Sequence, residues 1–359
     1  MDWLLRVTAF LAGGWLVVIT LASAARTFVL PRAAPDIITK AIFLGLRRLL
    51  ILRLGKSISY QQTDRVLAWY APLGLLLLVP SLYILVLFGY MFMFWAIGAD
   101  SWYMALRDSG SSLFTLGFET VNGLGYSLLA FSEAMIGLVL VALLVAYLPT
   151  IYAAFSRREA AVTLLEVRAG SPPSAEQMIL RYHRIHGISR LSQEWERWET
   201  WFADIQESHT SLAMLVFFRS PQPQHSWITA AGAVLDTAAV TLAVIDQPMD
   251  PSAALCIRGG YLALRAIADY FGIDYNHAPK PGDPIAVRRE EFDALLATLE
   301  LDNVPLKTDR EQAWRDFNGW RVNYDAVLLG LASLTNAPPA PWSSDRVSHA
   351  FFHLPNLPE

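Results

Sequence analysis

Residues 66–97 contain no formally charged side chain, and this run limits what the chain can fold into more than any other feature. As an α-helix it would be roughly 48 Å long, whereas the hydrocarbon core of a bilayer is about 30 Å thick. The run is too long for one upright crossing and too short for two, so it predicts one long membrane helix. Pro72 and Pro80 are expected to bend this helix or to confine its first turns to the interface.

Two further apolar runs have the length of a single membrane crossing. Residues 7–25 and 134–155 also lack charge, and as helices they would measure roughly 28 and 33 Å. The first run could instead be a secretory signal peptide, because Ala22-Ser23-Ala24 resembles a cleavage site. The segment before it sets Asp2 against Arg6 and so lacks a net positive charge, which favours a membrane anchor.

The segment between the first two runs is basic and sets the expected orientation. Cytoplasmic loops carry an excess of Lys and Arg, so residues 26–65 are expected on the cytoplasmic side. Three crossings would then place the protein in the inner (plasma) membrane with its N-terminus outside and its C-terminal domain in the cytoplasm. The basic residues are Arg26, Arg32, Lys40, Arg47, Arg48, Arg53, Lys56 and Arg65, against Asp36 and Asp64.

An amphipathic helix is expected within this basic segment, beginning after Pro35-Asp36. Apolar residues recur there at helical spacing, with Lys40, Arg47 and Arg48 between them. Such a helix lies either in the membrane interface or against the soluble domain. The pattern does not distinguish these two alternatives.

The sequence between residues 97 and 134 is too polar to span a bilayer and too apolar for an ordinary loop. We expect residues 102–113 to form a short helix that enters the membrane, and the residues after it to return to the same side. Non-helical backbone at membrane depth is tolerated only where protein or a water-filled cavity surrounds it. A central pore would provide that cavity; the alternative is an external loop.

The stretch Thr115-Leu116-Gly117-Phe118-Glu119 follows this short helix. It resembles the selectivity filter of the potassium-channel superfamily, which reads Thr-Val-Gly-Tyr-Gly. The resemblance covers an outer helix (66–97), a pore helix (102–113), a filter (115–119) and an inner helix (134–155), in the family's order. It implies a homotetramer in which the Thr115 hydroxyl and the carbonyl oxygens of Leu116, Gly117 and Phe118 line a path for the monovalent cations K⁺ and Na⁺.

Glu119 stands where that family has its second filter glycine. The resemblance therefore implies a ring of carboxylates at the outer mouth. A left-handed backbone would cost a non-glycine residue about 1–2 kcal/mol there, so we expect the outer filter to relax into another geometry and to lose its outermost carbonyl site. Potassium selectivity should be weaker than in the family. Gly137 and Pro149 in the inner helix are candidate gating positions by the same resemblance, or else packing features.

Residues 159–359 predict a soluble α-helical domain. Pro and Gly clusters divide this part into about six helices. Trp195, Trp198, Phe202 and Ile205 lie at helical spacing and predict a packed core. Residues 227–245 contain only one charge, Asp236, and are long enough for a fourth crossing. Their small side chains, the lack of a basic flank, and Arg258 and Arg265 in the next helix favour a buried soluble helix.

The expected fold is thus an all-α membrane protein: three transmembrane helices with a re-entrant pore helix and filter loop, followed by a soluble α-helical domain. The expected domains are the first transmembrane helix with the basic interfacial helix (1–65), the pore domain (66–158) and the cytoplasmic domain (159–359). Only 17% of the residues are charged, where about 25% is usual in soluble proteins, so the lipid membrane is an expected partner.

Other classes of function have little support in the sequence. The single cysteine, Cys256, excludes an intrachain disulfide, and no catalytic motif or basic nucleic-acid stripe is present. Neither enzymatic activity nor a cofactor is expected. A metal site is the weakest hypothesis and would use His183, His186, His209, Asp204 and Glu207. Two alternatives to a channel are a non-conducting receptor or scaffold that keeps the pore-domain architecture, and a membrane-anchored hydrolase that uses the histidines.

Overall fold

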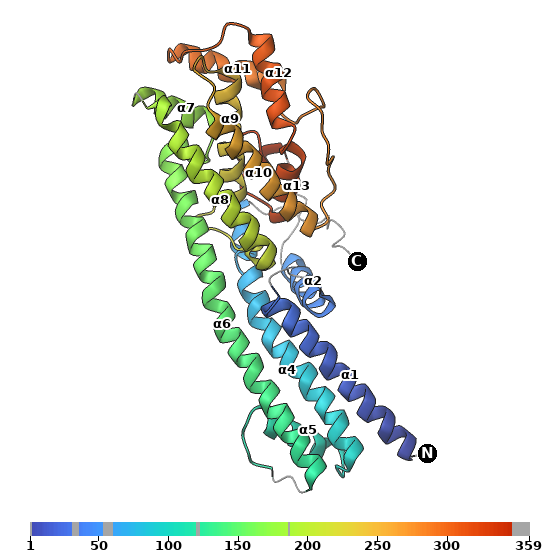
Figure 1. Ribbon diagram of the computed structural model, residues 1–359. Helices are drawn as coiled ribbons and strands as arrows, with labels where there is room; N and C mark the ends of the chain where they lie inside the picture. The colour runs from blue at the N-terminus through green and yellow to red at the C-terminus, as the bar shows by residue number, and fades with distance from the viewer. Residues whose placement is uncertain (1, 31–35, 53–59, 120–122, 186, 347–359) are drawn as a thin grey trace. The chain divides into compact units, whose positions relative to one another are not determined.

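The computed structural model describes residues 2–30, 36–52, 60–119, 123–185 and 187–346 (Figure 1). Within these ranges the regular structure is helical, as predicted, apart from one isolated antiparallel bridge between Ile245 and Leu306. The first helices are α1 (Asp2–Phe28), α2 (Ile37–Leu52), α3 (Tyr60–Leu67), α4 (Tyr70–Ile97), α5 (Trp102–Leu113) and α6 (Leu124–Ala169).

The remaining helices belong to the C-terminal part. They are α7 (Ala175–Arg184), η1 (Ile188–Arg190), α8 (Leu191–Ser211), η2 (Ala213–Phe217), α9 (Trp227–Val244), α10 (Pro251–Tyr270), α11 (Arg289–Leu301), α12 (Arg310–Arg321), α13 (Asp325–Thr335) and η3 (Ser344–Arg346). Packing divides the chain into two units. The first unit contains the described parts of 1–58 and 66–153, the second those of 59–65 and 154–359, so the boundary passes through α3 and α6.

Several apolar helices could cross a membrane. In the part of the chain that the structure describes, four helical stretches are long and apolar enough: Trp3–Phe28, Tyr60–Ile97, Leu124–Ala169 and Trp227–Val244. In the apolar windows of the first three stretches 17%, 39% and 22% of the residues are buried, whereas 94% of the fourth is buried inside the protein. A helix that is already covered by protein does not need lipid. The prediction that residues 227–245 form a buried helix is therefore confirmed.

Glycines allow α1 and α4 to approach each other closely. A Cβ atom at Gly13 would lie 2.3 Å from the carbonyl oxygen of Gly89, and one at Gly89 would lie 2.6 Å from the Val17 side chain. Apolar side chains gain little by leaving lipid for another apolar surface, so membrane helices associate through such close contacts between small residues. This pair of glycines fixes where the two helices cross.

The basic segment contains the amphipathic helix α2, which packs on α1 and α4 within the first unit. The Asp36 carboxylate accepts hydrogen bonds from the Thr39 amide (2.8 Å) at the start of α2 and from the Ser23 hydroxyl (2.6 Å) of α1. Phe43 on the covered face of α2 fills the space above Gly74 of α4. Ile37, Leu49 and Leu52 remain exposed, and so does Arg48 beside them.

Two helices differ in extent from their predictions. The outer helix, predicted over 66–97, already begins at Tyr60 and is interrupted at residues 68–69, so it forms α3 and α4. The inner helix, predicted over 134–155, extends in both directions to become α6. Arg157 and Arg158 end the apolar run but not the helix. Both have good helix propensity, so the helix continues through them. Arg158 is buried in the second unit.

The second unit is built around α9. The stripe of Trp195, Trp198, Phe202 and Ile205 is buried on α8, as predicted, and seven α-helices from α7 to α13 are present in the described residues where about six were expected. The one charge in α9, Asp236, forms an ion pair with the buried Arg321 of α12.

That charge is satisfied within the protein. The Tyr324 hydroxyl donates to Asp236 at 2.9 Å, and Arg321 also donates to Asp325 at 2.7 Å and to the Trp342 carbonyl at 2.6 Å. Buried charges are tolerated when they are paired and hydrogen-bonded in this way.

Candidate functional site

The helix predicted over 102–113 is present with those bounds as α5. Its first turn is capped by Ser101, whose side chain accepts from the Met104 amide at 3.2 Å and satisfies one of the free N–H groups at the helix start. Ser101 itself is extended, with φ −150° and ψ 163°. A serine cap after the Gly98-Ala99-Asp100 turn thus explains why α5 starts at residue 102.

The segment after α5, residues 114–119, folds back onto the end of the helix. The Ser111 carbonyl accepts from the amides of Leu116 (2.9 Å) and Gly117 (3.5 Å), and its hydroxyl accepts from the Glu119 amide (3.2 Å). Ser111 is buried, and these three hydrogen bonds hold the loop against the end of α5. The sequence pattern did not identify Ser111, because one serine in a Ser-rich helix carries no distinguishing signal.

Two residues of this loop adopt the left-handed backbone region. Thr115 has φ 53° and Gly117 has φ 68°, while Glu119 has no positive φ. Glu119 thus does not adopt the left-handed conformation of the family's glycine, in line with the expected relaxation of the outer filter, and the strained position is Thr115. A β-branched residue rarely adopts this conformation, and here its hydroxyl donates to the Phe114 carbonyl at 2.8 Å.

The Glu119 side chain forms an ion pair with Arg107 of α5. The Arg107 guanidinium also lies 5.7 Å from the ring centres of both Tyr103 and Phe118. The Glu119 carboxylate, which we expected at the outer mouth, thus has a partner from its own chain. The pair has no net charge, and it connects the end of the loop to the middle of α5.

Gly137 of α6 lies against the end of α5. A Cβ atom there would lie 2.3 Å from the Leu113 carbonyl oxygen at the end of α5, and the Tyr83 hydroxyl of α4 donates to the Gly137 carbonyl at 2.5 Å. Gly137 is thus a point of close contact between three helices. Pro149, the other gating candidate, lies inside α6, which continues past it.

A buried carboxyl group next to Gly137 was missed in the sequence. Glu133 of α6 is fully buried, and its Oε1 atom lies 2.5 Å from the Ser109 hydroxyl of α5. That hydroxyl also lies 3.1 Å from the Leu87 carbonyl of α4. One hydroxyl proton cannot serve two acceptors, so both contacts are satisfied when Glu133 carries a proton and donates it to Ser109. The available signal was an ionisable residue at the start of an apolar run.

In the second unit the buried Arg158 donates several hydrogen bonds. Its guanidinium donates to the carbonyls of Leu215 (2.8 Å) and Phe218 (2.7 Å) and to the carboxylate of Glu159 (2.9 Å). Leu215 and Phe218 belong to residues 215–219, which we call the bridging segment. A guanidinium has five N–H donors in a rigid fork, so one side chain can hold α6 to this segment at several points.

Arg219, the last residue of the bridging segment, holds α3 in the same manner. It forms an ion pair with Asp64 and donates to the Tyr60 hydroxyl at 2.7 Å. It also donates to the carbonyls of Thr335 (2.8 Å) and Asn336 (2.9 Å) at the end of α13. Two arginines therefore connect one short segment to α6 and to α3, the two helices that cross the unit boundary.

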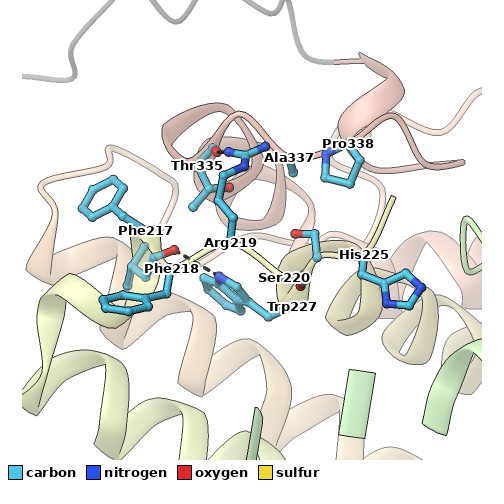
Figure 2. Close-up of a pocket in the computed structure, with 11 residues that line it drawn as sticks. Phe217, Phe218, Arg219, Ser220, His225, Trp227, Thr335, Ala337 and Pro338 are labelled. Carbon is cyan, nitrogen blue, oxygen red and sulfur yellow. Dashed lines mark hydrogen bonds between the residues drawn. The ribbon is translucent and has the colours of Figure 1, made fainter. Parts of the chain in front are cut away.

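Figure 2 shows the bridging segment along the wall of a small cavity. The Arg219 side chain extends towards Thr335, and on the opposite side the Trp227 indole donates to the Val216 carbonyl at 3.3 Å. The cavity has a volume of about 20 Å³, which is room for about one water molecule. The segment is thus held in place from several sides, and the cavity is too small for an organic ligand.

His209 completes the surroundings of Arg158. Arg158 can only donate, so the His209 Nε2 atom, 3.3 Å away, accepts and the ring is neutral with its proton on Nδ1. That proton points to the Ser208 hydroxyl oxygen at 3.1 Å, which in turn donates to the Asp204 carbonyl at 2.6 Å. Burial, and secondarily the charge of Arg158, holds the pKa of His209 well below its usual range.

The candidate metal site is described only in part, because His186 lies outside the described residues. His209 contacts the Arg158 guanidinium. In the described part of the chain no group of three or more His, Cys, Asp or Glu side chains could hold a metal ion. No protein-family model, curated protein or solved structure matches this chain.

Proposed function

We propose that the chain is one subunit of a cation channel with a degenerate potassium-channel-like filter. The observation that supports it most is the folding of residues 114–119 back onto α5, between the apolar helices α4 and α6. The loop turns at Thr115 and Gly117, and its peptide groups are the ion ligands in the proposal. Monovalent cations, K⁺ and Na⁺, are the proposed cargo.

The exposed side chains of this loop support assembly into a symmetric homotetramer. Phe114, Leu116 and Phe118 are 53%, 63% and 54% exposed in the single chain. Non-helical backbone in a membrane must be enclosed by protein or water, and one loop cannot enclose an ion by itself. Neighbouring copies around a central axis would cover these side chains and complete the path.

The orientation in this proposal follows the basic residues. The segment 26–65 and the second unit are cytoplasmic, and the N-terminus is outside, in the inner (plasma) membrane. Single cysteines at the exposed positions Asp100 and Asp274, in a Cys256→Ala background, test this with an impermeant thiol reagent on intact cells. Labelling at position 100 and protection at 274 are expected. Labelling at position 274 would reverse the orientation.

The Arg107–Glu119 pair favours a second candidate, a receptor or scaffold that keeps the pore-domain architecture without conducting. A guanidinium beside the loop repels cations, and the neutralised carboxylate no longer attracts them. The second unit would then be the working part of the protein. A measurement of ion conduction distinguishes the channel from the non-conducting receptor or scaffold.

The deciding experiment is planar-bilayer recording of the purified full-length protein between K⁺ and Na⁺ solutions. We expect cation currents with weak discrimination between the two ions. Gly117→Ala should reduce them strongly because of the left-handed backbone there, whereas Gly125→Ala in α6 serves as the matched control. Native mass spectrometry should show a tetramer. Currents that are absent, or that persist unchanged in Gly117→Ala, would remove the channel proposal.

A further inference from the structure

A larger cavity in the second unit lies where the end of α9 and the start of α10 meet α12. Its volume is about 330 Å³, at the lower end of the range for small-molecule sites. Ile245, Met249 and Trp320 supply apolar surface, and Lys307 and Asp316 bring charges of opposite sign to the same cavity. The cavity is separate from the bridging segment and from the pore loop.

Lys307 is held at the cavity by backbone contacts. Its Nζ atom donates to the Leu242 carbonyl at 2.7 Å, and its amide donates to the Val244 carbonyl at 2.9 Å, both at the end of α9. An ammonium group has three N–H donors, and this contact uses one of them. In the described residues Lys307 takes part in no ion pair.

Asp316 is held in a comparable way. It accepts from the side-chain amide of Gln312, one turn earlier in α12, at 2.7 Å. Like Lys307, it has no ion-pair partner in the part of the chain that the structure describes. The remaining carboxylate of the lining, Asp250, is engaged by the Ser252 amide (3.0 Å) and the Ser192 hydroxyl (2.8 Å), where it caps α10.

Besides the capping carboxylate of Asp250, the cavity is therefore lined by one cation, Lys307, and one anion, Asp316, that form no ion pair with each other. Opposite charges that face the same space without pairing are complementary to a ligand that carries both charges. We propose that this cavity binds a small zwitterion of the α-amino-acid class with an apolar side chain. The ligand carboxylate faces Lys307, its ammonium group faces Asp316, and its side chain packs on Trp320 and Met249.

The test uses three probes of one shape on the full-length protein in detergent micelles. L-Phenylalanine carries both charges, phenethylamine lacks the carboxylate, and 3-phenylpropanoate lacks the ammonium group. Isothermal titration calorimetry gives the dissociation constant of each. L-Phenylalanine should bind roughly tenfold or more tightly than either of the other two, because each charged hydrogen bond contributes to its affinity.

Substitutions then assign each charge to its residue. Lys307→Gln should remove the advantage of L-phenylalanine over phenethylamine, and Asp316→Asn should remove its advantage over 3-phenylpropanoate. Lys280→Gln and Asp274→Asn, at exposed positions outside the cavity lining, are the matched controls and should change nothing.

The binding measurement does not depend on whether the pore conducts. The inference is overturned if none of the probes binds, if the singly charged probes bind as well as L-phenylalanine, or if the preference survives both substitutions. Asp316 is partly exposed, so Asp316→Asn keeps the test valid even if Lys307→Gln disturbs the end of α9.

Discussion

Arg158 of α6 donates a 2.7 Å hydrogen bond to the carbonyl of Phe218, the residue directly before Arg219. Arg219 in turn holds α3 through Asp64 and Tyr60. The contact to α6 and the contact to α3 are thus made by two consecutive residues, Phe218 and Arg219. A displacement of residues 215–219 would act on both helices together.

Arg219→Gln should destabilise the second unit by about 3 kcal/mol, because it leaves the buried Asp64 carboxylate without its partner. Urea unfolding of the full-length protein in micelles, followed by tryptophan fluorescence, measures this. Arg157→Gln is the matched control. Its ion pair with Asp204 is exposed, and its loss should cost less than about 1 kcal/mol. Equal losses in the two variants would contradict the proposed contact.

Acid should weaken the second unit through His209. The pKa of this residue is depressed in the folded protein, so the folded state holds it neutral while the unfolded state binds a proton below about pH 6.5. The stability it contributes is complete above that pH and is lost as the pH falls, by at most about 1.4 kcal/mol per pH unit. Between pH 7 and 5 the free energy of unfolding should depend less on pH in His209→Gln than in the wild type. In His277→Gln, a substitution at an exposed position, the pH dependence should be unchanged.

The Arg107–Glu119 pair should set charge selectivity if the protein conducts. Glu119→Gln leaves the guanidinium alone and should shift reversal potentials towards anions. Arg107→Gln leaves the carboxylate alone and should increase cation preference and block by divalent cations. Reversal potentials in KCl gradients measure both variants. If neither variant moves them, the pair does not face the ion path.

Gly137→Ala should disturb the contact between α5 and α6, because the added methyl group would lie 2.3 Å from the Leu113 carbonyl oxygen. Overpacking of this kind costs about 1–3 kcal/mol. Thermal unfolding in micelles gives the loss. Gly125→Ala, on the same helix with no atom near its Cβ position, should lie within about 1 kcal/mol of wild type. A stable Gly137→Ala variant would mean that α5 is not seated on α6.

Glu133→Gln should be tolerated, because an amide can make the same donation to Ser109 that a protonated carboxyl makes. Glu133→Leu should cost about 1–3 kcal/mol, because it removes a buried hydrogen-bond partner. Thermal unfolding of both variants at pH 7 compares them. A loss in Glu133→Gln as large as that in Glu133→Leu would contradict the hydrogen bond to Ser109.

The sequence predicted the helices well where one physical signal was strong. Uninterrupted apolar runs predicted α1, α4 and the membrane part of α6, and the Trp195 to Ile205 stripe predicted the buried face of α8. The ends of the helices were harder to predict. The charges at Arg157 and Arg158 mark where the apolar run stops, but a helix continues through arginine as readily as through leucine.

The site residues found only in the structure have no distinguishing signal in their local sequence. Glu133 and Arg219 become significant because tertiary packing places them against Ser109 and Asp64. Ser111 becomes significant because the chain turns back on it at residues 116–119. Glu119 lies twelve positions after Arg107, and no local pattern requires their contact.

The interruption at residues 68–69 breaks the backbone hydrogen-bond ladder between α3 and α4. The Trp69 amide donates to the Val66 carbonyl at 3.2 Å, and the Leu73 amide donates to the Trp69 carbonyl at 2.9 Å. In α6 the helix continues past Pro149, but a proline has no N–H to donate, so the ladder lacks one hydrogen bond there. Each of the two described helices that pass from one unit to the other thus carries one local break, a turn in the first and a proline in the second.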